Sequence, residues 1–362
     1  MALHATDPAT VYLSVRARMA HGVTAASIED SLYERRDLVR MLAMRRTVFV
    51  VPVESVPVVQ AAATDRVGQG QRARLLKLLA ETGAVADPGP WLADVEQSVL
   101  RALDDLGGTA TAAELAAAEP RLKTTLLMAE GKSYQASQAI TSRVLLVLAA
   151  QGRIVRGRPI GSWLSQQYRW VLAGQWLPAS QASAVVAVSE TAARKELARL
   201  WLAAFGPAPL TDLKWWTGWT MGQVRQAVAA LNAAEVDLGA GTGVVLADDL
   251  EPTEDPGEWV TLLPALDATV MGWSGRSWFL GPHAASLFDA NGNAGPTIWV
   301  NGQVVGGWAH RADGEIAIRL LEDVGAEATK RIEAEAERLG TWLGGSRVIP
   351  RFRTPTEREL SA

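Results

Sequence analysis

Residues 91–118 read WLADVEQSVLRALDDLGGTATAAELAAA, and this stretch predicts two helices in close succession. Apolar residues recur at helical spacing over its first half: Val95, Val99, Leu100, Leu103 and Leu106. This spacing predicts an amphipathic helix, and Gly107-Gly108 ends it because glycine readily adopts the conformation of a helix C-terminus. Thr111-Ala-Ala-Glu114 has the pattern of a capping box, so a short second helix is expected from there through Ala118.

The residues that follow complete a recognisable order of elements. A third helix is expected over about residues 133–151 and is ended by Gly152. A strand Arg153–Arg156, a turn-rich loop and a return strand Tyr168–Leu172 come next. Three helices followed by a two-stranded hairpin are typical of a winged helix, whose third helix lies in the major groove of DNA.

Residues 197–246 repeat this order. Helices are expected over Leu197–Ala204, Leu210–Trp216 and a third segment that starts at a capping box, Thr220-Met-Gly-Gln223, and runs through Ala234. The strands Val236–Leu238 and Val244–Leu246 are expected to pair across the glycines of residues 239–243. The repetition predicts a second winged helix.

The N-terminal segment holds a further helix–strand pattern. Ser27-Ile-Glu-Asp30 fits the start of a helix, and apolar positions follow it at Ile28, Leu32, Leu38 and Leu42. The β-branched run Arg46–Pro52 then predicts a strand that is stopped by proline. We interpret this segment as part of a third winged-helix unit.

Residues 259–362 change character towards short strands separated by turns. The expected strands are Trp259–Leu263, Thr269–Trp273, Thr297–Val300, Gln303–Trp308, Ile316–Leu320 and Arg347–Pro350. Asn301-Gly302 and Asp313-Gly314 are two-residue hairpin signals, and a helix is expected over about residues 325–343. Closely spaced short strands predict a small barrel or sandwich.

These elements together predict an α+β fold of three tandem winged-helix units followed by a C-terminal small β-barrel with a helix. The expected domains are residues 1–88, 89–178, 179–255 and 256–362, in that order.

Composition removes several classes of chemistry. The 362 residues contain no cysteine, which excludes disulfides, thiol nucleophiles and iron–sulfur ligation. The four histidines, His4, His21, His283 and His310, are far apart in sequence, so a metal site is not expected and we predict no cofactor. The chain shows no secretory signal at Met1 and no apolar run of membrane-spanning length. We therefore expect a cytoplasmic protein with no membrane partner.

Charge is distributed unevenly along the chain. The net charge is −4, yet residues 1–80 hold eleven Lys and Arg against seven Asp and Glu, whereas residues 179–257 hold five against ten. Such asymmetry indicates a surface that faces a polyanion, and ordinary scatter of surface charge is the alternative. The candidate DNA-binding residues flank the first strand and cluster on the hairpin of residues 153–172: Arg35, Arg36, Arg40, Arg45, Arg46, Arg153, Arg156, Arg158, Trp163 and Arg169. Arginine pairs well with phosphate, and every phosphate contact adds salt-dependent affinity for DNA.

Several short segments of the sequence resemble those of a known family. Residues 31–52 read SLYERRDLVRMLAMRRTVFVVP, and the C-terminal part contains LLPALD (262–267), WFLGPH (278–283), NGNAGP (291–296) and VGGW (305–308). In these runs the chain resembles the winged-helix DNA-binding family of bacterial alkylation-repair glycosylases, which includes the azinomycin-resistance and interstrand-crosslink glycosylases. The resemblance covers essentially the whole chain. It implies three winged helices, a β-barrel, and hydrolysis of the N-glycosidic bond of alkylated or crosslinked purines in double-stranded DNA.

The resemblance also points to a catalytic motif at the start of the chain. Characterised members carry Gln–hydrophobic–Gln or Gln–hydrophobic–Asp, and the matching positions here are His4 and Thr6, with Asp7 next in line. Both motif positions therefore depart from the family pattern. The resemblance implies a helical segment before this motif, so we expect the first unit to be truncated at its N-terminus.

The chemistry of such a site needs a placed water and stabilisation of a positively charged sugar. Neutral His4 can accept a proton from that water, the Thr6 hydroxyl can orient it, and Asp7 can supply negative charge beside the developing cation. The alternative interpretation is structural, because Thr6-Asp7-Pro8 also fits a helix cap with proline in the first turn.

Two classes of function stay open on the sequence alone. The first is a monofunctional DNA glycosylase that acts on alkylated or crosslinked DNA in association with the nucleoid. The second is a non-catalytic winged-helix DNA-binding protein, either a transcription regulator or a damage binder. Three DNA-binding winged-helix units in one chain favour a monomer over the usual dimeric regulator, which carries one such unit per subunit.

Overall fold

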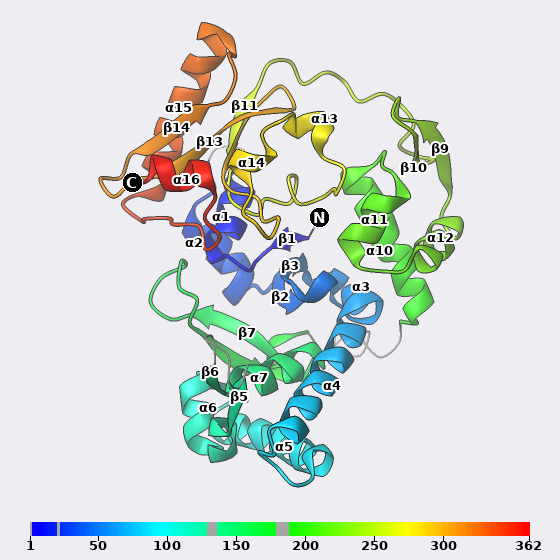
Figure 1. The fold of residues 1–362 in the computed structure, drawn as a ribbon, viewed down its shortest axis with the longest axis vertical. Helices are drawn as coiled ribbons and strands as arrows, with labels where there is room; N and C mark the ends of the chain where they lie inside the picture. The colour runs from blue at the N-terminus through cyan, green and yellow to red at the C-terminus, as the bar shows by residue number, and fades with distance from the viewer. Residues whose placement is uncertain (1, 20–21, 129–135, 179–187) are drawn as a thin grey trace. The chain divides into compact units, whose positions relative to one another are not determined.

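The computed structural model describes residues 2–19, 22–128, 136–178 and 188–362. Helices and small antiparallel sheets alternate along the chain, so the fold is mixed α and β (Figure 1). The chain divides into two compact units, which we call the terminal unit (Met1–Glu29 and Ala198–Ala362) and the middle unit (Asp30–Leu197). The four domain boundaries expected from the sequence remain predictions.

The terminal unit begins with short elements and ends in a sheet covered by helices. Its elements are β1 (Leu3–His4), α1 (Pro8–Arg16), α2 (Ala25–Glu29), α11 (Leu210–Thr217), α12 (Met221–Ala229), β9 (Ala233–Asp237), β10 (Thr242–Leu246), β11 (Val260–Leu263), α13 (Ser277–Leu280), α14 (Ala284–Leu287), β12 (Thr297–Val300), β13 (Gln303–His310), β14 (Ile316–Leu320), α15 (Gly325–Leu343) and α16 (Pro355–Leu360). Helix α10 (Glu190–Phe205) precedes α11 and confirms the helix expected over Leu197–Ala204.

The four C-terminal strands form an antiparallel sheet in the order β11-β12-β13-β14. Asn301 and Gly302 connect β12 to β13 with φ of 47° and 85°, the left-handed conformation that the Asn-Gly signal predicts. Helix α15 packs against β11 and β14, and α16 packs against β13. The expected strands at these positions and the helix over 325–343 are confirmed.

Two strands expected in this region are absent from the described residues. Thr269–Trp273 forms turns instead, because the backbone of Asp267 accepts a hydrogen bond from Met271 N–H and its side chain accepts one from Thr269 N–H. Arg347–Pro350 is irregular, and there Val348 N–H donates to the His310 side chain, at 3.2 Å, where a strand would need a backbone partner.

The segment 210–246 agrees with the expected order except at one helix end. Thr220 and Gln223 form the capping box that starts α12, as predicted. The helix ends at Ala229, not at Ala234, because residues from Ala233 onward pair with β10 in the β9–β10 hairpin. This pairing across residues 238–241 confirms the expected hairpin.

The middle unit is built from long helices and three small hairpins. Its elements are β2 (Leu38–Leu42), β3 (Val48–Pro52), α3 (Val56–Val59), α4 (Asp65–Glu81), α5 (Pro88–Asp105), β4 (Thr109–Ala110), α6 (Ala112–Ala118), β5 (Thr125–Met128), β6 (Ala136–Ala139), α7 (Thr141–Ala150), β7 (Ile154–Pro159), β8 (Tyr168–Leu172) and α8 (Ala173–Trp176). Helix α5 and the Thr111–Glu114 capping box of α6 are confirmed, as is the β7–β8 hairpin.

Two helices expected in this unit are shorter than predicted. Residues 136–139 lie in β6, which pairs with β5, so the helix expected over 133–151 begins only at Thr141; residues 133–135 lie outside the described part. Likewise, Leu38–Leu42 is strand β2, paired with β3, and the helical segment that starts at Ala25 ends at Glu34. Arg36, with φ of 61°, takes the left-handed conformation between that helical segment and β2.

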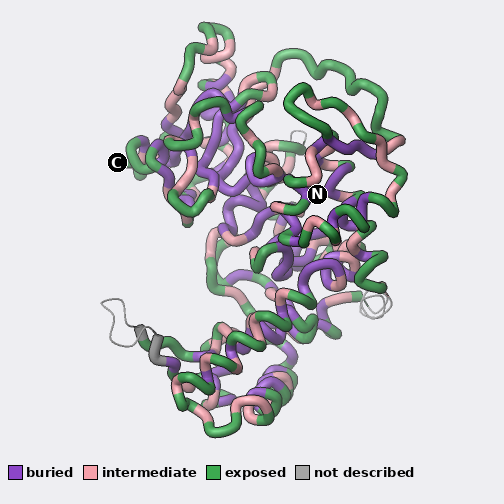
Figure 2. Tube along the Cα trace, turned by 45° about the vertical axis from the view of Figure 1, so that its right-hand side comes forward, coloured by how far each residue is buried: buried purple, intermediate pink, exposed green. Residues whose placement is uncertain are grey.

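The core of the middle unit joins α4, α5, α6 and α7 to the β4-β8-β7 sheet through buried leucines, valines and Trp170. Figure 2 shows this as helices with one buried and one exposed side. In this unit the N-terminus of α7 and the β7–β8 hairpin lie around one shared cavity.

Candidate functional site

The predicted motif lies immediately before α1 in the terminal unit. His4 belongs to β1 and is buried, Thr6 is half-buried, and Asp7 is the N-cap of α1. The Asp7 carboxylate accepts two backbone hydrogen bonds, from Ala9 N–H to Oδ1 (3.0 Å) and from Arg351 N–H to Oδ2 (2.8 Å). The helix-cap interpretation of Thr6-Asp7-Pro8 is therefore confirmed for Asp7, with Pro8 as the first helical residue.

The environment of Asp7 favours a positioning role. Burial raises the pKa of this carboxyl group, while its two backbone hydrogen bonds and the charge of Arg351 oppose that rise. Both carboxylate oxygens already hold backbone N–H groups, so Asp7 ties the start of α1 to the C-terminal segment. Its predicted part in catalysis remains a prediction, as do those of His4 and Thr6.

Helix α1 is anchored by polar side chains spaced four residues apart. Thr10 Oγ1 donates to Ala265 O (2.7 Å), and Ser14 Oγ donates to Asp267 Oδ2 (2.6 Å). Arg18 adds a two-pronged contact to Asp267, at 2.9 and 2.7 Å. Ser14 and Asp267 are both fully buried, whereas Arg18 reaches the Asp267 carboxylate from an exposed position.

Sequence reasoning missed this anchor, although a signal was present. Thr10, Ser14 and Arg18 recur at the spacing of one helix face, and Asp267 ends a quoted run, LLPALD. What the sequence could not supply was that these positions, about 250 residues apart, meet. The contact fixes the direction in which β1 and the His4–Thr6 segment enter α1.

The arginines flanking β2 and β3 fall into different environments. Arg45 and Arg46 form the turn between these strands, with φ of 52° and 64°, and both are exposed. Arg35 is exposed and forms ion pairs with Asp30 and Asp37. Arg40 is buried on β2 opposite Val50, and so is not a surface residue of the kind expected.

Three of the predicted arginines lie over aromatic rings of the middle unit. The guanidinium of Arg36 lies 4.5 Å from the Trp176 ring, and that of Arg158 lies 5.2 Å from Tyr33. Arg156 lies 5.3 Å from Tyr168 and 5.0 Å from Trp170, and its Nε donates to Tyr168 Oη at 2.8 Å. These contacts favour fixed orientations of the three guanidinium groups.

The remaining predicted residues lie around the same hairpin. Arg153 is exposed directly before β7, and Trp163 is half-buried in the loop between β7 and β8. Arg169 is exposed on β8 and forms an ion pair with Glu114 at 3.3 Å. Arg158 pairs with Glu34 at 2.6 Å, which joins the hairpin to the start of the middle unit.

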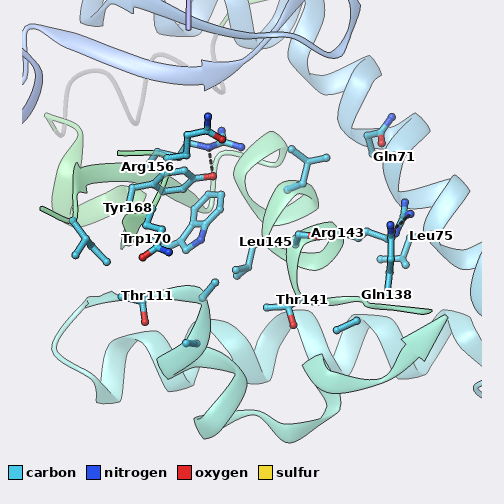
Figure 3. A pocket seen from close by; sticks show the side chains of 18 residues that line it. Gln71, Leu75, Thr111, Gln138, Thr141, Arg143, Leu145, Arg156, Tyr168 and Trp170 are labelled. Atoms are coloured by element: carbon cyan, nitrogen blue, oxygen red, sulfur yellow. Dashed lines mark hydrogen bonds between the residues drawn. The ribbon is translucent and has the colours of Figure 1, made fainter. Parts of the chain in front are cut away.

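A cavity of about 900 Å³ lies where α4, α7 and the β7–β8 hairpin approach one another. We call it the basic pocket, and its principal polar and aromatic residues are Gln71, Gln138, Arg143, Arg156, Tyr168 and Trp170. Figure 3 shows Arg156, Tyr168 and Trp170 together on one side and Gln71, Gln138 and Arg143 on the other. Among the described residues that line it, two are arginines, four are glutamines and none is acidic.

Sequence reasoning found Arg156 in this pocket and missed Arg143. Arg143 is half-buried in the first turn of α7, and its Nη2 lies 3.3 Å from Gln138 Oε1. A helix N-terminus also carries partial positive charge, which adds to that of the two arginines. The basic pocket therefore suits a phosphate group, with amides available to a neighbouring polar group.

Within the described residues, no group of three or more histidine and acidic side chains comes together as a metal site would require. None of the described helices is both long enough and apolar enough to cross a membrane.

Comparison with known proteins gives a family and a fold. A family model described as DNA glycosylase AlkZ-like matches residues 1–342 of the 362. The solved structure of the Streptomyces sahachiroi DNA glycosylase AlkZ superposes with a TM-score of 0.69 at 20% sequence identity, covering 96% of this chain and 90% of that one. No curated protein matches the sequence.

Proposed function

The chain belongs to the AlkZ-like DNA glycosylase family, and from that premise we propose that it hydrolyses the N-glycosidic bond of alkylated or crosslinked purines in double-stranded DNA. The observation that carries the proposal is the anchored β1–α1 junction. His4 and Thr6 precede a helix whose cap and buried face are tied to Arg351, Ala265 and Asp267. These contacts fix the backbone from which His4 and Thr6 project, and a fixed backbone supports the placement of one water.

The proposed reaction needs only groups that this segment offers. Water attacks the anomeric carbon, and the bond from that carbon to the purine nitrogen breaks, with its electron pair passing to the base. His4 accepts the proton released by the water, and the Thr6 hydroxyl orients that water. An alkylated purine is cationic before the reaction and leaves as a neutral base, so little further assistance is needed.

Contact with DNA is assigned to the middle unit. The basic pocket and the exposed Arg45, Arg46 and Arg153 offer cations to the phosphate backbone. We further propose that residues 89–178 form a winged helix with α7 as its recognition helix, because the order of α5, α6, α7 and the β7–β8 hairpin supports it. The repeat in residues 179–255 would be another winged helix and the β11–β14 sheet part of a barrel, with the protein acting as a monomer.

The test is release of a methylated purine from duplex DNA that carries 7-methylguanine. The wild-type chain is expected to release the base, and His4→Ala is expected to lose about 10²-fold or more in rate, as removal of a general base does. His4→Gln restores the residue of the characterised motif and is expected to recover much of this loss.

His283→Ala is the matched control, because it removes a histidine of the same unit that lies outside the motif and contacts Glu322. It is expected to keep the wild-type rate. If wild type binds alkylated duplex more tightly than undamaged duplex but releases no base, the proposal fails in favour of a non-catalytic damage binder. Preference for one undamaged sequence, without regard to alkylation, would instead indicate a regulator.

A further inference from the structure

A second cavity of about 900 Å³ lies in the terminal unit and differs from the basic pocket in its lining. It is bounded by the α10–α11 connection, the tip of the β9–β10 hairpin and the segment before α13. We call it the acidic pocket, and the residues used below are Asp212, Trp273, Gly275, Ser277 and Trp278. Among the described residues that line it, Asp212 is the one ionisable side chain.

The Asp212 carboxylate is held in place by hydrogen bonds to one of its two oxygens, and the other oxygen can bind a ligand. The residue lies in the first turn of α11 and is only 3% exposed. Its Oδ1 accepts the N–H groups of Ser274 and Gly275, both at 2.9 Å. Within the described part of the chain, both of these hydrogen bonds go to Oδ1, and Oδ2 is not one of the fully buried side-chain atoms that lack a partner, so it is accessible from the cavity. A buried carboxylate with an unused oxygen beside a cavity calls for a donor or a cation from outside the protein.

The wall next to Asp212 is aromatic. Trp273 and Trp278 meet edge to face with their ring centres 5.5 Å apart. Trp273 is fixed by a hydrogen bond from its Nε1 to Phe205 O at 3.2 Å, whereas Trp278 is 61% exposed. Neither ring carries a cation of the described residues, unlike Trp170 and Trp176. An exposed tryptophan on a concave surface is a platform for a planar ligand.

The negative charge of Asp212 determines which kind of planar ligand the acidic pocket favours. Because none of the described lining residues is basic, the Asp212 carboxylate repels phosphate and favours a positive ring over a neutral one. Aromatic faces attract cations as well, so both features select the same ligand class. We propose that the acidic pocket binds a cationic N-alkylated purine, with its ring against Trp273 and Trp278 and its charge beside Asp212; this inference rests on the proposed function and names its substrate-recognition site.

The hydroxyl of Ser277 lines the same cavity and is available to the polar edge of the base. The ligand that carries this charge is a base turned out of the duplex and still joined to its sugar, because the base becomes neutral when it leaves.

The first measurement is calorimetric titration of the full chain with two nucleosides, 7-methylguanosine and guanosine, at a pH where the methylated base is a cation. Wild type is expected to bind the methylated nucleoside on the order of ten-fold more tightly. Asp212→Asn is expected to abolish this preference, because its Oδ1 still accepts both N–H groups while the charge is lost. Equal affinities in wild type, or an unchanged preference in the variant, would overturn the proposal.

A second variant tests shape while the charge stays. A Cβ added at Gly275 would lie 3.6 Å from Asp212 Oδ2, an ordinary contact that would partly cover the carboxylate. Gly275→Ala is therefore expected to weaken binding of 7-methylguanosine several-fold. Asp249→Asn, which removes an exposed carboxylate after β10, is the control and is expected to bind as wild type does.

Two further arms identify the source of the base. A loss of affinity for duplex containing 7-methylguanine in Asp212→Asn, with undamaged duplex unaffected, indicates the extruded base. Free 7-methylguanine is neutral, so its product inhibition is expected to be the same in Asp212→Asn as in wild type. If this variant loses no affinity for the methylated duplex, the proposal is contradicted. His4→Ala is expected to bind the nucleoside with wild-type affinity. This result would show that ligand binding in the acidic pocket is tested independently of the proposed catalytic role of His4.

Discussion

The basic and acidic pockets have nearly the same volume and opposite chemistry. Each encloses about 900 Å³, one in the middle unit and one in the terminal unit. Arg143 and Arg156 line the first, whereas Asp212 is the ionisable residue that lines the second. Both pockets are lined by tryptophan. They differ in the charge of their ionisable side chains and in whether an arginine of the protein already lies over the tryptophan ring.

The use of the rings explains what each pocket can accept. In the basic pocket, Arg156 already lies over the faces of Tyr168 and Trp170, so the protein supplies its own cation and the ligand must be an anion. In the acidic pocket, Trp278 is 61% exposed and Asp212 supplies the anion, so the cation must come from the ligand. Phosphate and alkylated base are the two parts of damaged DNA that fit these complementary demands.

The largest expected effect separates the two tryptophans. Trp170 is 4% exposed within the core of the middle unit, and truncating a large buried aromatic residue costs about 3–5 kcal/mol. Trp278 is 61% exposed, so Trp278→Ala is expected to change the free energy of unfolding by no more than about 0.5 kcal/mol. Urea denaturation followed by circular dichroism measures both.

Trp170→Phe serves as the graded control, since it keeps an aromatic ring in the core and should fall between wild type and alanine. Similar destabilisation by Trp170→Ala and Trp278→Ala would show that both rings are structural. The proposed difference between the two pockets, a structural tryptophan in one and a ligand-binding tryptophan in the other, would then be wrong.

The next effect concerns the anion-binding side. Replacing both Arg143 and Arg156 with glutamine is expected to weaken duplex binding by at least about 100-fold, because each charge-assisted contact is worth about 1.5–3 kcal/mol. The slope of log affinity against log salt should also become shallower by about 1.8 for two lost phosphate contacts. Fluorescence anisotropy at several salt concentrations measures both quantities.

Arg101→Gln is the matched control, because Arg101 is exposed on α5 of the same unit and does not line the basic pocket. If this control weakens binding as much as the double variant does, affinity arises from overall charge and the basic pocket has no special part in it.

Signals confined to a few residues predicted the fold well. The capping boxes at Thr111 and Thr220, the glycines after α5 and the Asn301-Gly302 turn each act through neighbouring backbone groups, and all are found in place. Spaced apolar residues were less decisive. Leu38 and Leu42 fit one face of a helix, yet the segment is a strand, because pairing with β3 settles what periodicity alone leaves ambiguous.

The candidate sites depended on contacts that no local pattern contains. The resemblance singled out His4 and Asp7, but the fixing of α1 requires Asp267, which the chain brings to Ser14 only through folding. Asp212 was expected to lie in a helix and nothing more, since its environment comes from residues 273–278. Arg143 was hidden in the same way within an expected helix. A pocket forms where elements far apart in the sequence come together. The sequence therefore predicted the helices and strands that line each pocket, but not which charged side chains meet there.

The smallest expected effect is a pH dependence that arises from a histidine of the terminal unit. The described histidines His4, His283 and His310 lie in this unit, and the sequence has no histidine in residues 30–197. His310 is buried, and its Nδ1 accepts a hydrogen bond from Val348 N–H at 3.2 Å, which requires an unprotonated nitrogen. Burial and the charge of Arg347 lower the pKa of His310 below its ordinary value of 6.5.

The sign of the effect follows from that lowered pKa. The folded state favours neutral His310, so the stability it contributes is fully present above pH 6.5 and is lost as pH falls through the folded pKa. His310→Asn keeps an acceptor for Val348 N–H and cannot titrate, so its urea midpoint is expected to change less than that of wild type across this range. His283→Asn is the control that leaves the Val348 contact intact. Should wild type and His310→Asn lose stability in parallel, another group sets the acid limit, and the terminal unit owes no pH sensitivity to this histidine.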